Sequence, residues 1–551
     1  MEPVWLKNYQ EGVPATIDPD QYVSLNALFA DAILKYKDLP AFTNVGQVLT
    51  YAEVDQQSRD FAAFLQNNFK MVKGERFAIM MPNVIQYPVA MLGILRAGCI
   101  VVNVNPLYTS EEFEHQVRDA QATGLIVLEN YAHVVTPVLA KTDIKHIVIA
   151  KISDVFPLPK SLFVDFIIKY VKRMVPAWKL PSFYWYKDVL KQGAQFKYVD
   201  PKVTGKDVAF LQYTGGTTGV PKGAMLTHRN IVANTLQGAA WMGKTLVPRK
   251  EMVITALPLY HIFSLTINCF ILFYAGALNV LITNPKDTKA FIKDLKKHKF
   301  TVITGVNTLF NLLLNAKGFD TINFDALKLA IGGGMAVQKV VADRWQQATK
   351  SPLLQGYGLT EASPAVCMEP MSFTCFKGGI GLPMPSTEVT IRDDKGHEVD
   401  FDQPGELWIR GPQVMLGYWH QELETNNVLD AEGWLHSGDI ATISSEGFMK
   451  IVDRKKDLIL VSGFKIFPNE VEDIIAAMPG VREVAIVGAP DPISGEKVMA
   501  FIVKTNPQIT AEDVRAYCHE HLTGYKIPKE IEFRATLPKN NVGKILRREL
   551  R

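Results

Sequence analysis

Leu211-Gln-Tyr-Thr-Gly-Gly-Thr-Thr-Gly-Val-Pro-Lys-Gly-Ala224 is the stretch of this sequence that most narrows its fold and chemistry. It begins in an apolar segment, residues 208–212, which has the pattern of a buried β-strand. Its glycines allow backbone N–H groups to approach an anion closely, while its threonine hydroxyls and Lys222 add donors and charge. The stretch predicts a phosphate-binding loop rather than a plain surface turn. It is not a Walker A loop, because Lys222 is followed by Gly223 and not by Ser or Thr.

The composition is that of a soluble, globular protein with several domains. The chain has 551 residues, of which 48% are hydrophobic and 21% charged, so about three or four domain-sized units are expected. The 59 basic and 56 acidic side chains nearly cancel, which argues against a protein that coats nucleic acid. The five cysteines form no CxxC pair and no secretion signal is evident, so we expect a reduced, cytoplasmic protein.

The longest apolar run, residues 267–282, is interrupted by Asn268 and Asn279. It falls short of the roughly 20 residues that a membrane-spanning helix needs. We expect it to form a buried helix, a turn and a strand.

Short apolar runs alternate with amphipathic stretches over the first two thirds of the chain. Strands are expected at residues 76–81, 100–104, 124–128, 147–150, 208–212, 252–256, 301–304 and 327–331. Helical periodicity separates several of them, at residues 84–96, 289–297 and 336–348. This alternation predicts an α/β fold whose parallel sheets are covered on both faces.

The pattern changes after about residue 378. Runs such as 388–392 and 406–410 are short and punctuated by glycine and proline, which predicts a small β-rich unit. After the charged segment 453–457, helix and strand signals alternate again and predict a compact α+β unit. The last set comprises a helix beginning at Pro468, strands at 484–487 and 498–503, and a helix at 511–521.

We therefore expect an N-terminal domain of residues 1–455 and a C-terminal α+β domain of residues 456–551. Within the first, α/β subdomains occupy residues 1–377 and a β-rich subdomain occupies residues 378–455.

Six further blocks carry chemistry in the order of the chain. They are Pro258-Leu-Tyr-His261, Gly332-Gly-Gly334, Gln355-Gly-Tyr-Gly-Leu-Thr-Glu361, Gly433-Trp-Leu-His-Ser-Gly-Asp439, Val452-Asp-Arg-Lys-Lys-Asp457 and Pro538-Lys-Asn-Asn-Val-Gly-Lys544. Tyr357 lies between two glycines, so its ring can lie flat against a purine. Glu361 offers a hard oxygen ligand for Mg²⁺. Asp439 and Arg454 suit two adjacent ribose hydroxyls, although surface ion pairs are the simpler alternative for such residues.

Together, the seven blocks resemble those of the adenylate-forming superfamily, which includes acyl-CoA synthetases, luciferases and peptide-synthetase adenylation domains. The resemblance spans essentially the whole chain and is strongest to bacterial long-chain fatty-acid–CoA ligases. It implies that ATP activates a fatty acid as an acyl-AMP and that coenzyme A then receives the acyl group. ATP, Mg²⁺ and coenzyme A are the implied cofactors and co-substrates, and the C-terminal domain is implied to be mobile about a hinge at Lys456.

The resemblance also assigns roles to individual residues. Catalytic roles fall to Lys544, Glu361, His261, Thr218 and Lys222, and metal ligation falls to Glu361 and Thr218. ATP and AMP would be bound by Thr214, Gly215, Gly216, Thr217, Thr218, Gly219, Lys222, Gly333, Gly334, Gln355, Gly356, Tyr357, Gly358, Thr360, Asp439, Arg454 and Lys544. The acyl chain would contact His261, Phe263, Leu265 and Gly332, and coenzyme A would contact Ser462, Gly463 and Lys465.

Several alternatives stay open at this point. His261 heads an apolar run and is equally typical of a core histidine, and Lys544 lies among other basic residues, as in a solvated tail. Leu265 stands where some long-chain relatives have a gating tryptophan. The chain could therefore be a medium-chain or other carboxylate–CoA ligase, a fatty-acyl-AMP ligase that loads a carrier protein, or a non-catalytic nucleotide-binding protein. A homodimer is also left open.

Residues 156–191 allow two interpretations. The segment has seven basic and two acidic residues, and one helical stripe contains Leu162, Phe163, Phe166, Ile167, Tyr170 and Met174. Such a segment can lie on an anionic bilayer, in peripheral contact with the inner membrane. A helix packed on the protein's own core is the more ordinary outcome. The lysines within residues 286–299 are expected on the solvated face of a helix.

Overall fold

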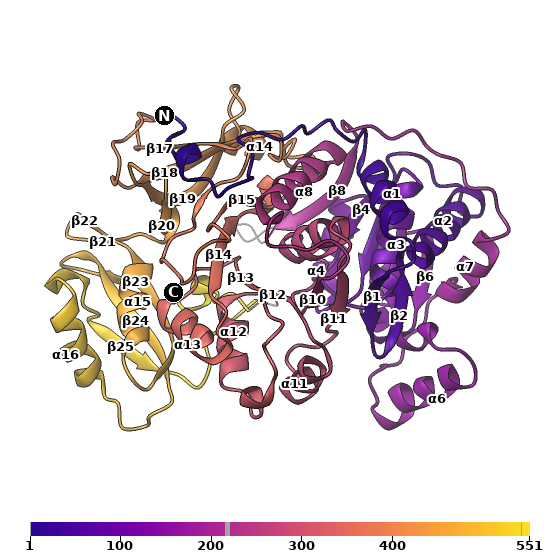
Figure 1. Cartoon of the computed structure of the whole chain (residues 1–551). Coiled ribbons are helices and arrows are strands. Elements are labelled where there is room, and N and C mark those ends of the chain that lie inside the picture. Colours follow the sequence, from indigo (N-terminus) through magenta and orange to yellow (C-terminus); the bar gives the residue numbers. More distant parts are fainter. Residues whose placement is uncertain (1, 215–220, 541–542) are drawn as a thin grey trace.

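The computed structural model describes residues 2–214, 221–540 and 543–551, and these form four β-sheets covered by helices. Two large sheets fill the body of the molecule, and two smaller sheets lie at its other end (Figure 1). The described residues thus confirm the predicted α/β architecture with smaller β-rich and α+β units.

The first large sheet has seven strands in the order β7-β6-β5-β3-β4-β8-β9. All of its neighbours are parallel except β8 and β9. Its central strands are continuous buried apolar runs, as expected when helices cover both faces. The strands are β3 (Arg76–Met80), β4 (Ile100–Asn103), β5 (Gly124–Leu128), β6 (His146–Ala150), β7 (Tyr184–Trp185), β8 (Val208–Thr214) and β9 (Lys222–Thr227).

The antiparallel β8–β9 pair holds the two ends of the glycine-rich stretch. Thr214 at the end of β8 lies opposite Lys222 at the start of β9. Residues 215–220 between them lie outside the described residues. Lys222 is therefore held at the carboxyl edge of the sheet, beside the last residue of β8.

The second large sheet has nine strands in the order β16-β15-β14-β13-β12-β10-β11-β1-β2. Its middle, from β14 to β1, is parallel, and both edges are antiparallel. The strands are β1 (Pro40–Asn44), β2 (Gln47–Thr50), β10 (Met252–Thr255), β11 (Leu278–Leu281), β12 (Val302–Gly305), β13 (Leu329–Gly332), β14 (Leu353–Gly358), β15 (Ala365–Met368) and β16 (Leu382–Pro383).

Helices surround these two sheets (Figure 1). Capping boxes begin three of them: α2 with Thr50 and Glu53, α4 with Thr109 and Glu112, and α8 with Thr227 and Asn230. The helices are α1 (Leu25–Tyr36), α2 (Tyr51–Asn67), α3 (Gln86–Arg96), α4 (Ser110–Asp119), α5 (Ala132–Val135), α7 (Tyr186–Gly193), α8 (His228–Met242), α11 (Thr288–Lys297), α12 (Asn307–Leu314) and α13 (Lys339–Thr349).

The apolar run at residues 267–282 is buried as predicted. A continuous helical segment passes from α9 (Ile262–Ser264) through the π-helix η6 (Leu265–Ile271) to α10 (Leu272–Tyr274), and β11 follows after a turn. Every residue of η6 is buried. No helix in the described part of the chain is long and apolar enough to cross a membrane.

The two smaller sheets follow in the last third of the chain. The antiparallel sheet β17-β18-β19-β20 comprises Glu388–Arg392, Gly405–Arg410, Leu435–Ile443 and Met449–Arg454, with α14 (Glu422–Val428) beside it. The last sheet comprises β21 (Ile459–Val461), β22 (Phe464–Ile466), β23 (Val481–Asp491), β24 (Gly495–Lys504) and β25 (Glu530–Phe533). Helices α15 (Pro468–Ala477) and α16 (Ala511–His521) pack with it around a separate small core.

Element boundaries differ from the sequence predictions by a few residues. The largest shift is in β23, which spans Val481–Asp491 where a strand was expected at residues 484–487. Helix α13 begins at Lys339 rather than at residue 336. The N–H of Val337 donates to Gln355 Oε1 at 2.6 Å, and the N–H of Gln338 donates to Asn307 Oδ1 at 3.0 Å. These backbone donors bind side chains of neighbouring elements, so the helix begins after them.

The segment after β6 corrects one prediction. It contains α6 (Lys160–Phe166) and the π-helix η5 (Ile167–Val171), which protrude at the lower right of Figure 1. Phe163, Phe166 and Tyr170 of the predicted stripe are exposed. The packed-helix interpretation is therefore wrong for this stripe. Trp178, farther along the segment, does pack against the core.

Candidate active site

A cavity of about 1530 Å³ lies where the large sheets, the β-rich sheet and the C-terminal residues meet. It brings together most of the residues predicted from the blocks. These are Thr214, Lys222, His261, Phe263, Gly333, Gly334, Gln355, Gly356, Tyr357, Gly358, Thr360, Glu361, Asp439, Arg454, Lys456 and Lys544.

Other predicted residues do not line this cavity. Leu265 is fully buried in the core, and Gly332 ends β13 one residue before the cavity wall. Ser462, Gly463 and Lys465 are also absent from the lining. Gly215, Gly216, Thr217, Thr218 and Gly219 lie outside the described residues.

Lys222 and Glu361 are connected through an aromatic residue, Tyr418. The Tyr418 hydroxyl donates to Glu361 Oε1 at 2.7 Å, and the Lys222 ammonium lies 5.3 Å from the centre of the Tyr418 ring. Lys222 also forms an ion pair with Glu424 of α14. Burial, and then the Glu361 carboxylate, raise the pKa of Tyr418, so it remains a neutral hydrogen-bond donor. An anionic ligand at Lys222 would compete with Glu424 for the ammonium.

Tyr357, Asp439 and Arg454 form a second polar group in the cavity. The Tyr357 hydroxyl donates to Asp439 Oδ2 at 2.6 Å, and Arg454 Nε lies 3.2 Å from Asp439 Oδ1. The strand register places Asp439 directly opposite Arg454. A carboxylate can accept about four hydrogen bonds, so Asp439 can still accept from ligand hydroxyls. The ion-pair interpretation and the ribose interpretation are therefore compatible.

His261 forms part of the apolar side of the cavity. Its Nδ1 accepts the N–H of Phe263 at 3.3 Å, at the beginning of α9. This contact leaves Nε2 as the protonated nitrogen of the neutral ring. Burial, and then the nearby Lys544 charge, lower the pKa of His261 to about 4. The ring is therefore neutral at pH 7 and does not repel a cation beside it.

Gly333 also lines the cavity and packs closely against Phe263 and Gly356. A Cβ atom at this position would lie 3.2 Å from the Phe263 ring and 3.2 Å from the carbonyl oxygen of Gly356. The missing side chain allows the chain after β13 to pass between α9 and β14.

Lys544 reaches the cavity from the C-terminal residues. Its N–H donates to Asn540 Oδ1 at 2.8 Å, and the N–H of Asn540 donates to the Lys544 carbonyl at the same distance. Thr308 of α12 donates to the carbonyl of Gly543 at 3.1 Å. Gly543 has a φ of +90°, and a Cβ there would lie 2.5 Å from Thr308 Oγ1, so this approach requires glycine.

The electrostatic surroundings of Lys544 disfavour its charged form. Burial, and then the positive charge of Arg454, lower the pKa of Lys544 to about 7, while Asp439 acts in the opposite direction. Such a lysine gains its proton readily when an anion arrives. This is the behaviour expected of a residue that binds phosphate and carboxylate groups together.

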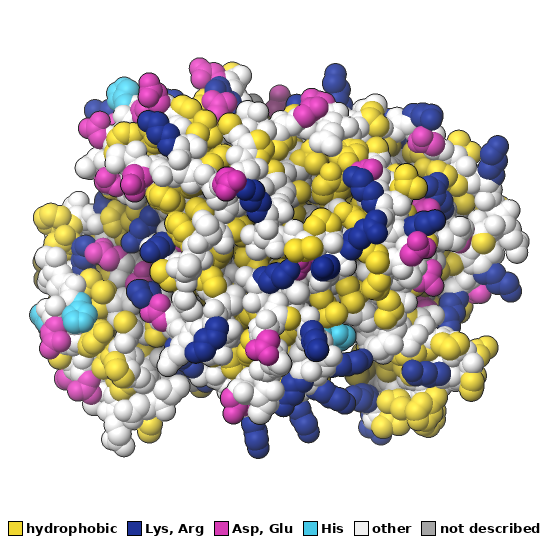
Figure 2. Space-filling model, in the orientation of Figure 1, with side chains coloured by type: hydrophobic (Ala, Val, Ile, Leu, Met, Phe, Trp, Pro, Cys, Tyr) yellow, Lys and Arg dark blue, Asp and Glu magenta, His cyan; other side chains and the backbone are white. Residues whose placement is uncertain are grey.

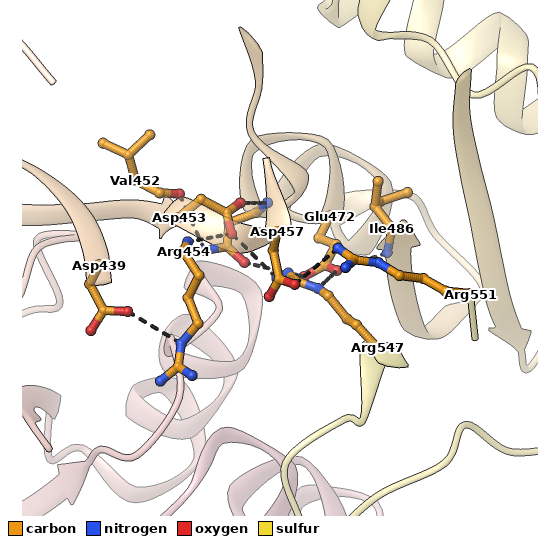
Figure 3. A network of polar contacts seen from close by, with 10 residues as sticks. Asp439, Val452, Asp453, Arg454, Asp457, Glu472, Ile486, Arg547 and Arg551 are labelled. Carbon is orange, nitrogen blue, oxygen red and sulfur yellow. Dashed lines mark hydrogen bonds and ion pairs between the residues drawn. The ribbon is translucent and has the colours of Figure 1, made fainter. Parts of the chain in front are cut away.

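A cluster of charges connects the C-terminal residues to the segment 453–457 (Figure 3). Arg547 donates to Glu472 Oε2 at 2.8 Å and lies 3.3 Å from Asp453 and 3.4 Å from Asp457. Arg551 lies 3.0 Å from Asp457. Burial lowers the pKa of Arg547, but the carboxylates of Glu472 and Asp453 outweigh it and raise the value. The cluster holds the chain around Lys544 against the predicted hinge.

Lys456 lies inside this region. It belongs to a short 3₁₀ turn at Lys455–Asp457 and lines the cavity. Burial, and then Arg454, lower the pKa of its ammonium.

The residues assigned to coenzyme A lie in the β21–β22 hairpin instead. Ser462 and Gly463 form its turn, with φ values of +51° and +85°. Lys465 forms an ion pair with Asp394 at 3.1 Å. In this arrangement, Lys544 and not the hairpin turn is at the cavity.

A candidate Mg²⁺ ligand, Glu361, lines the cavity. No group of three or more His, Cys, Asp and Glu that could hold a metal occurs among them. Glu361 does offer a carboxylate to the cavity, and Mg²⁺ typically takes one or two carboxylates together with phosphates and water.

Sequence reasoning missed several residues of this site. Tyr418, Glu424, Thr308 and Asn540 contact predicted residues but lie outside the seven blocks or had no assigned role. An aromatic residue directly after a glycine, as in Gly417-Tyr418, was the available signal for the first. Nothing in the sequence places Glu424 next to Lys222, because the two are 202 positions apart.

Comparison with known proteins agrees with this geometry. The model of the AMP-binding enzyme family matches residues 29–419, and that of the AMP-binding enzyme C-terminal domain matches residues 470–544. The chain belongs to the AMP-binding enzyme family. The resemblance noted from the sequence blocks is thereby confirmed.

Relatives within the family are similar over their full length. The chain is 52% identical to a protein of Yersinia pestis and 53% identical to one of Escherichia coli O157:H7, both named long-chain-fatty-acid–CoA ligase. Each comparison covers 100% of this chain and 98% of the relative. A Bacillus subtilis protein of the same name is 36% identical over 99% of this chain and 97% of its own length.

Solved structures share the fold. The anthranilate CoA ligase AuaEII in complex with anthranoyl-AMP has a TM-score of 0.86 at 22% identity, over 97% of this chain and 98% of its own. ATP-bound MatB from Rhodopseudomonas palustris has a TM-score of 0.81 at 25% identity, over 96% and 98%.

Proposed function

We propose that this protein is an AMP-forming long-chain fatty-acid–CoA ligase. The observation that carries the proposal is the position of Lys544 in one cavity with Tyr357, Asp439 and His261. Its full-length relatives with this name support the choice of a long-chain acid.

In the first step, a carboxylate oxygen of the fatty acid attacks the α-phosphorus of ATP, and pyrophosphate leaves. Two anions must approach each other, and negative charge is redistributed on the phosphate oxygens as the bond forms. Lys544 would supply a cation between the carboxylate and the α-phosphate. Lys222, together with the glycine-rich stretch and Thr218, would bind the other phosphates.

Each remaining group has a positioning role. Tyr357 would contact the adenine ring, while Asp439 and Arg454 would bind the ribose hydroxyls. Glu361 would hold Mg²⁺, which supplies neutralising charge to the phosphates when it is bound. Neutral His261 and Phe263 would separate the polar cavity from the acyl chain.

In the second step, the thiol of coenzyme A attacks the acyl carbonyl and AMP leaves. We assign residues 1–455 to the N-terminal domain and 456–551 to the mobile C-terminal domain, with Lys456 as the pivot. Rotation would remove Lys544 from the cavity and bring Ser462, Gly463 and Lys465 to the path of the pantetheine arm.

Apolar side chains that line the cavity support a hydrophobic acyl group. They include Ile262, Ile267, Val306 and Ile331. Burial contributes about 0.8 kcal/mol per CH₂, so each extra carbon that such a wall accommodates strengthens binding severalfold.

We also propose a cytoplasmic location in peripheral contact with the inner membrane, where long-chain fatty acids partition. A homodimer stays a prediction, and sedimentation velocity would test it.

The proposed activity is tested by measuring pyrophosphate release with carboxylates from C2 to C20, with and without coenzyme A. We expect the highest kcat/KM with long chains, and acyl-CoA as the product. A maximum at C8 would favour a medium-chain ligase. Adenylate that accumulates despite coenzyme A would favour a fatty-acyl-AMP ligase.

A further inference from the structure

The arm formed by α6 and η5 has its polar face turned toward the protein. Asp165 accepts from Ser153 Oγ at 2.5 Å and forms an ion pair with Lys151 at 3.0 Å. On the preceding turn, the buried Ser161 accepts from Lys187 at 3.3 Å. These contacts fix which side of the helix faces the body of the protein.

The opposite side of the arm is apolar and exposed. Seven large side chains within 17 residues are at least half exposed: Leu158 72%, Leu162 64%, Phe163 65%, Phe166 56%, Tyr170 63%, Val171 65% and Met174 50%. Single exposed apolar residues are ordinary, but a contiguous patch marks an interaction site. The patch is the yellow protrusion at the lower right of Figure 2.

Basic side chains accompany this patch. Lys160, Lys172 and Arg173 are exposed on the arm itself. Helix α11 and its flanks add a second basic group, and among the described residues none of its members forms an ion pair: Lys286, Lys289, Lys293, Lys296, Lys297 and Lys299. In Figure 2, dark-blue side chains gather at the place of α11, on the same lower edge as the apolar protrusion.

We infer that this edge is the surface with which the protein binds an anionic lipid bilayer. The apolar side chains of the arm enter the interface between headgroups and acyl chains, and the α11 lysines lie on the headgroups. Unpaired lysines beside a protruding apolar tip fit an extended anionic surface, because mobile lipid headgroups can neutralise each of them.

The inference specifies the surface for the proposed membrane contact, and its test does not depend on catalysis. Flotation of the full-length protein with phosphatidylglycerol–phosphatidylethanolamine vesicles compares wild type with Phe163→Ser/Phe166→Ser and with Lys293→Glu/Lys297→Glu. Each lysine near an anionic surface contributes about fivefold in partitioning, so the charge reversals should weaken binding more than tenfold. The Phe substitutions should weaken it severalfold. Wild type should bind phosphatidylcholine vesicles poorly.

Matched controls change equally exposed residues elsewhere. Leu34→Ser/Val48→Ser removes two side chains that are 76% and 52% exposed, and Lys250→Glu/Lys395→Glu reverses two exposed lysines. These variants should bind vesicles like wild type, and all variants should activate soluble octanoate equally. Unchanged binding of the arm and α11 variants would overturn the inference, as would equal losses in the controls. A change of oligomeric state without a change in vesicle binding would instead indicate a contact between copies of the chain.

Discussion

Lys544 is the residue proposed to supply the cation for the first chemical step, and its protonation can be tested. Its pKa is lowered to about 7 in the absence of ligand, so the ammonium is present below that pH and is lost above it. We expect kcat/KM for adenylation to fall about tenfold per unit as pH rises above about 7, because this ratio reports the free enzyme. The measurement is pyrophosphate release against pH.

Lys544→Arg is the matched variant for this prediction. Arginine stays charged throughout this range. The kcat/KM of the variant should therefore not decrease as pH rises above about 7, even if kcat/KM is lower than in the wild type at every pH. The same decrease of kcat/KM above pH 7 in the variant would show that a group other than Lys544 titrates.

The charge cluster around Arg547 is the feature to test at the level of elements, because it joins the C-terminal residues to α15 and the hinge. Arg547→Ala removes the cation that pairs with Glu472 and Asp453, while Asp457 keeps its ion pair with Arg551. Breaking a buried charge pair typically costs about 3–5 kcal/mol. We expect a lower Tm at pH 7.5 and a smaller loss at pH 5.5, because burial raises the pKa values of Asp453 and Glu472 and these two carboxyl groups take up protons more readily at the lower pH. Thermal unfolding at both pH values measures this.

Arg534→Ala is the control, because Arg534 pairs with Glu532 at a half-exposed position. Its effect should be small at both pH values. Equal destabilisation of Arg547→Ala at the two pH values would mean that lost packing, rather than unpaired charge, dominates.

At the scale of the whole molecule, we expect adenylation and thioester formation to use two different faces of the C-terminal domain. Lys544→Ala should lower adenylation by orders of magnitude, yet still convert supplied palmitoyl-AMP and coenzyme A to thioester. Lys456→Pro fixes φ near −65° at the pivot, so it should release pyrophosphate but form thioester slowly. Single-turnover assays of each half-reaction separate these outcomes. If both variants fold and lose adenylation and thioester formation equally, rotation of the C-terminal domain does not separate the two half-reactions.

The sequence predicted the structure best where a local pattern of residue types is compatible with few structures. Apolar runs identified the parallel strands, because strands buried on both faces have few other patterns. The blocks around Tyr357, Asp439 and Lys544 predicted residues that the structure brings into one cavity. Glu424, the partner of Lys222, was missed because contacts between distant segments leave no local pattern. The α6 stripe was misjudged, because periodicity shows that a helix has an apolar face but not which way that face points.

The low pKa of Lys544 also has a thermodynamic consequence for ligand binding. An empty cavity at pH 7 holds this group about half protonated, and anions beside it favour the charged form. Substrate binding therefore takes up about half a proton from the solvent at pH 7, and nearly a whole one at pH 8. The heat measured on binding ATP therefore depends on the ionisation enthalpy of the buffer.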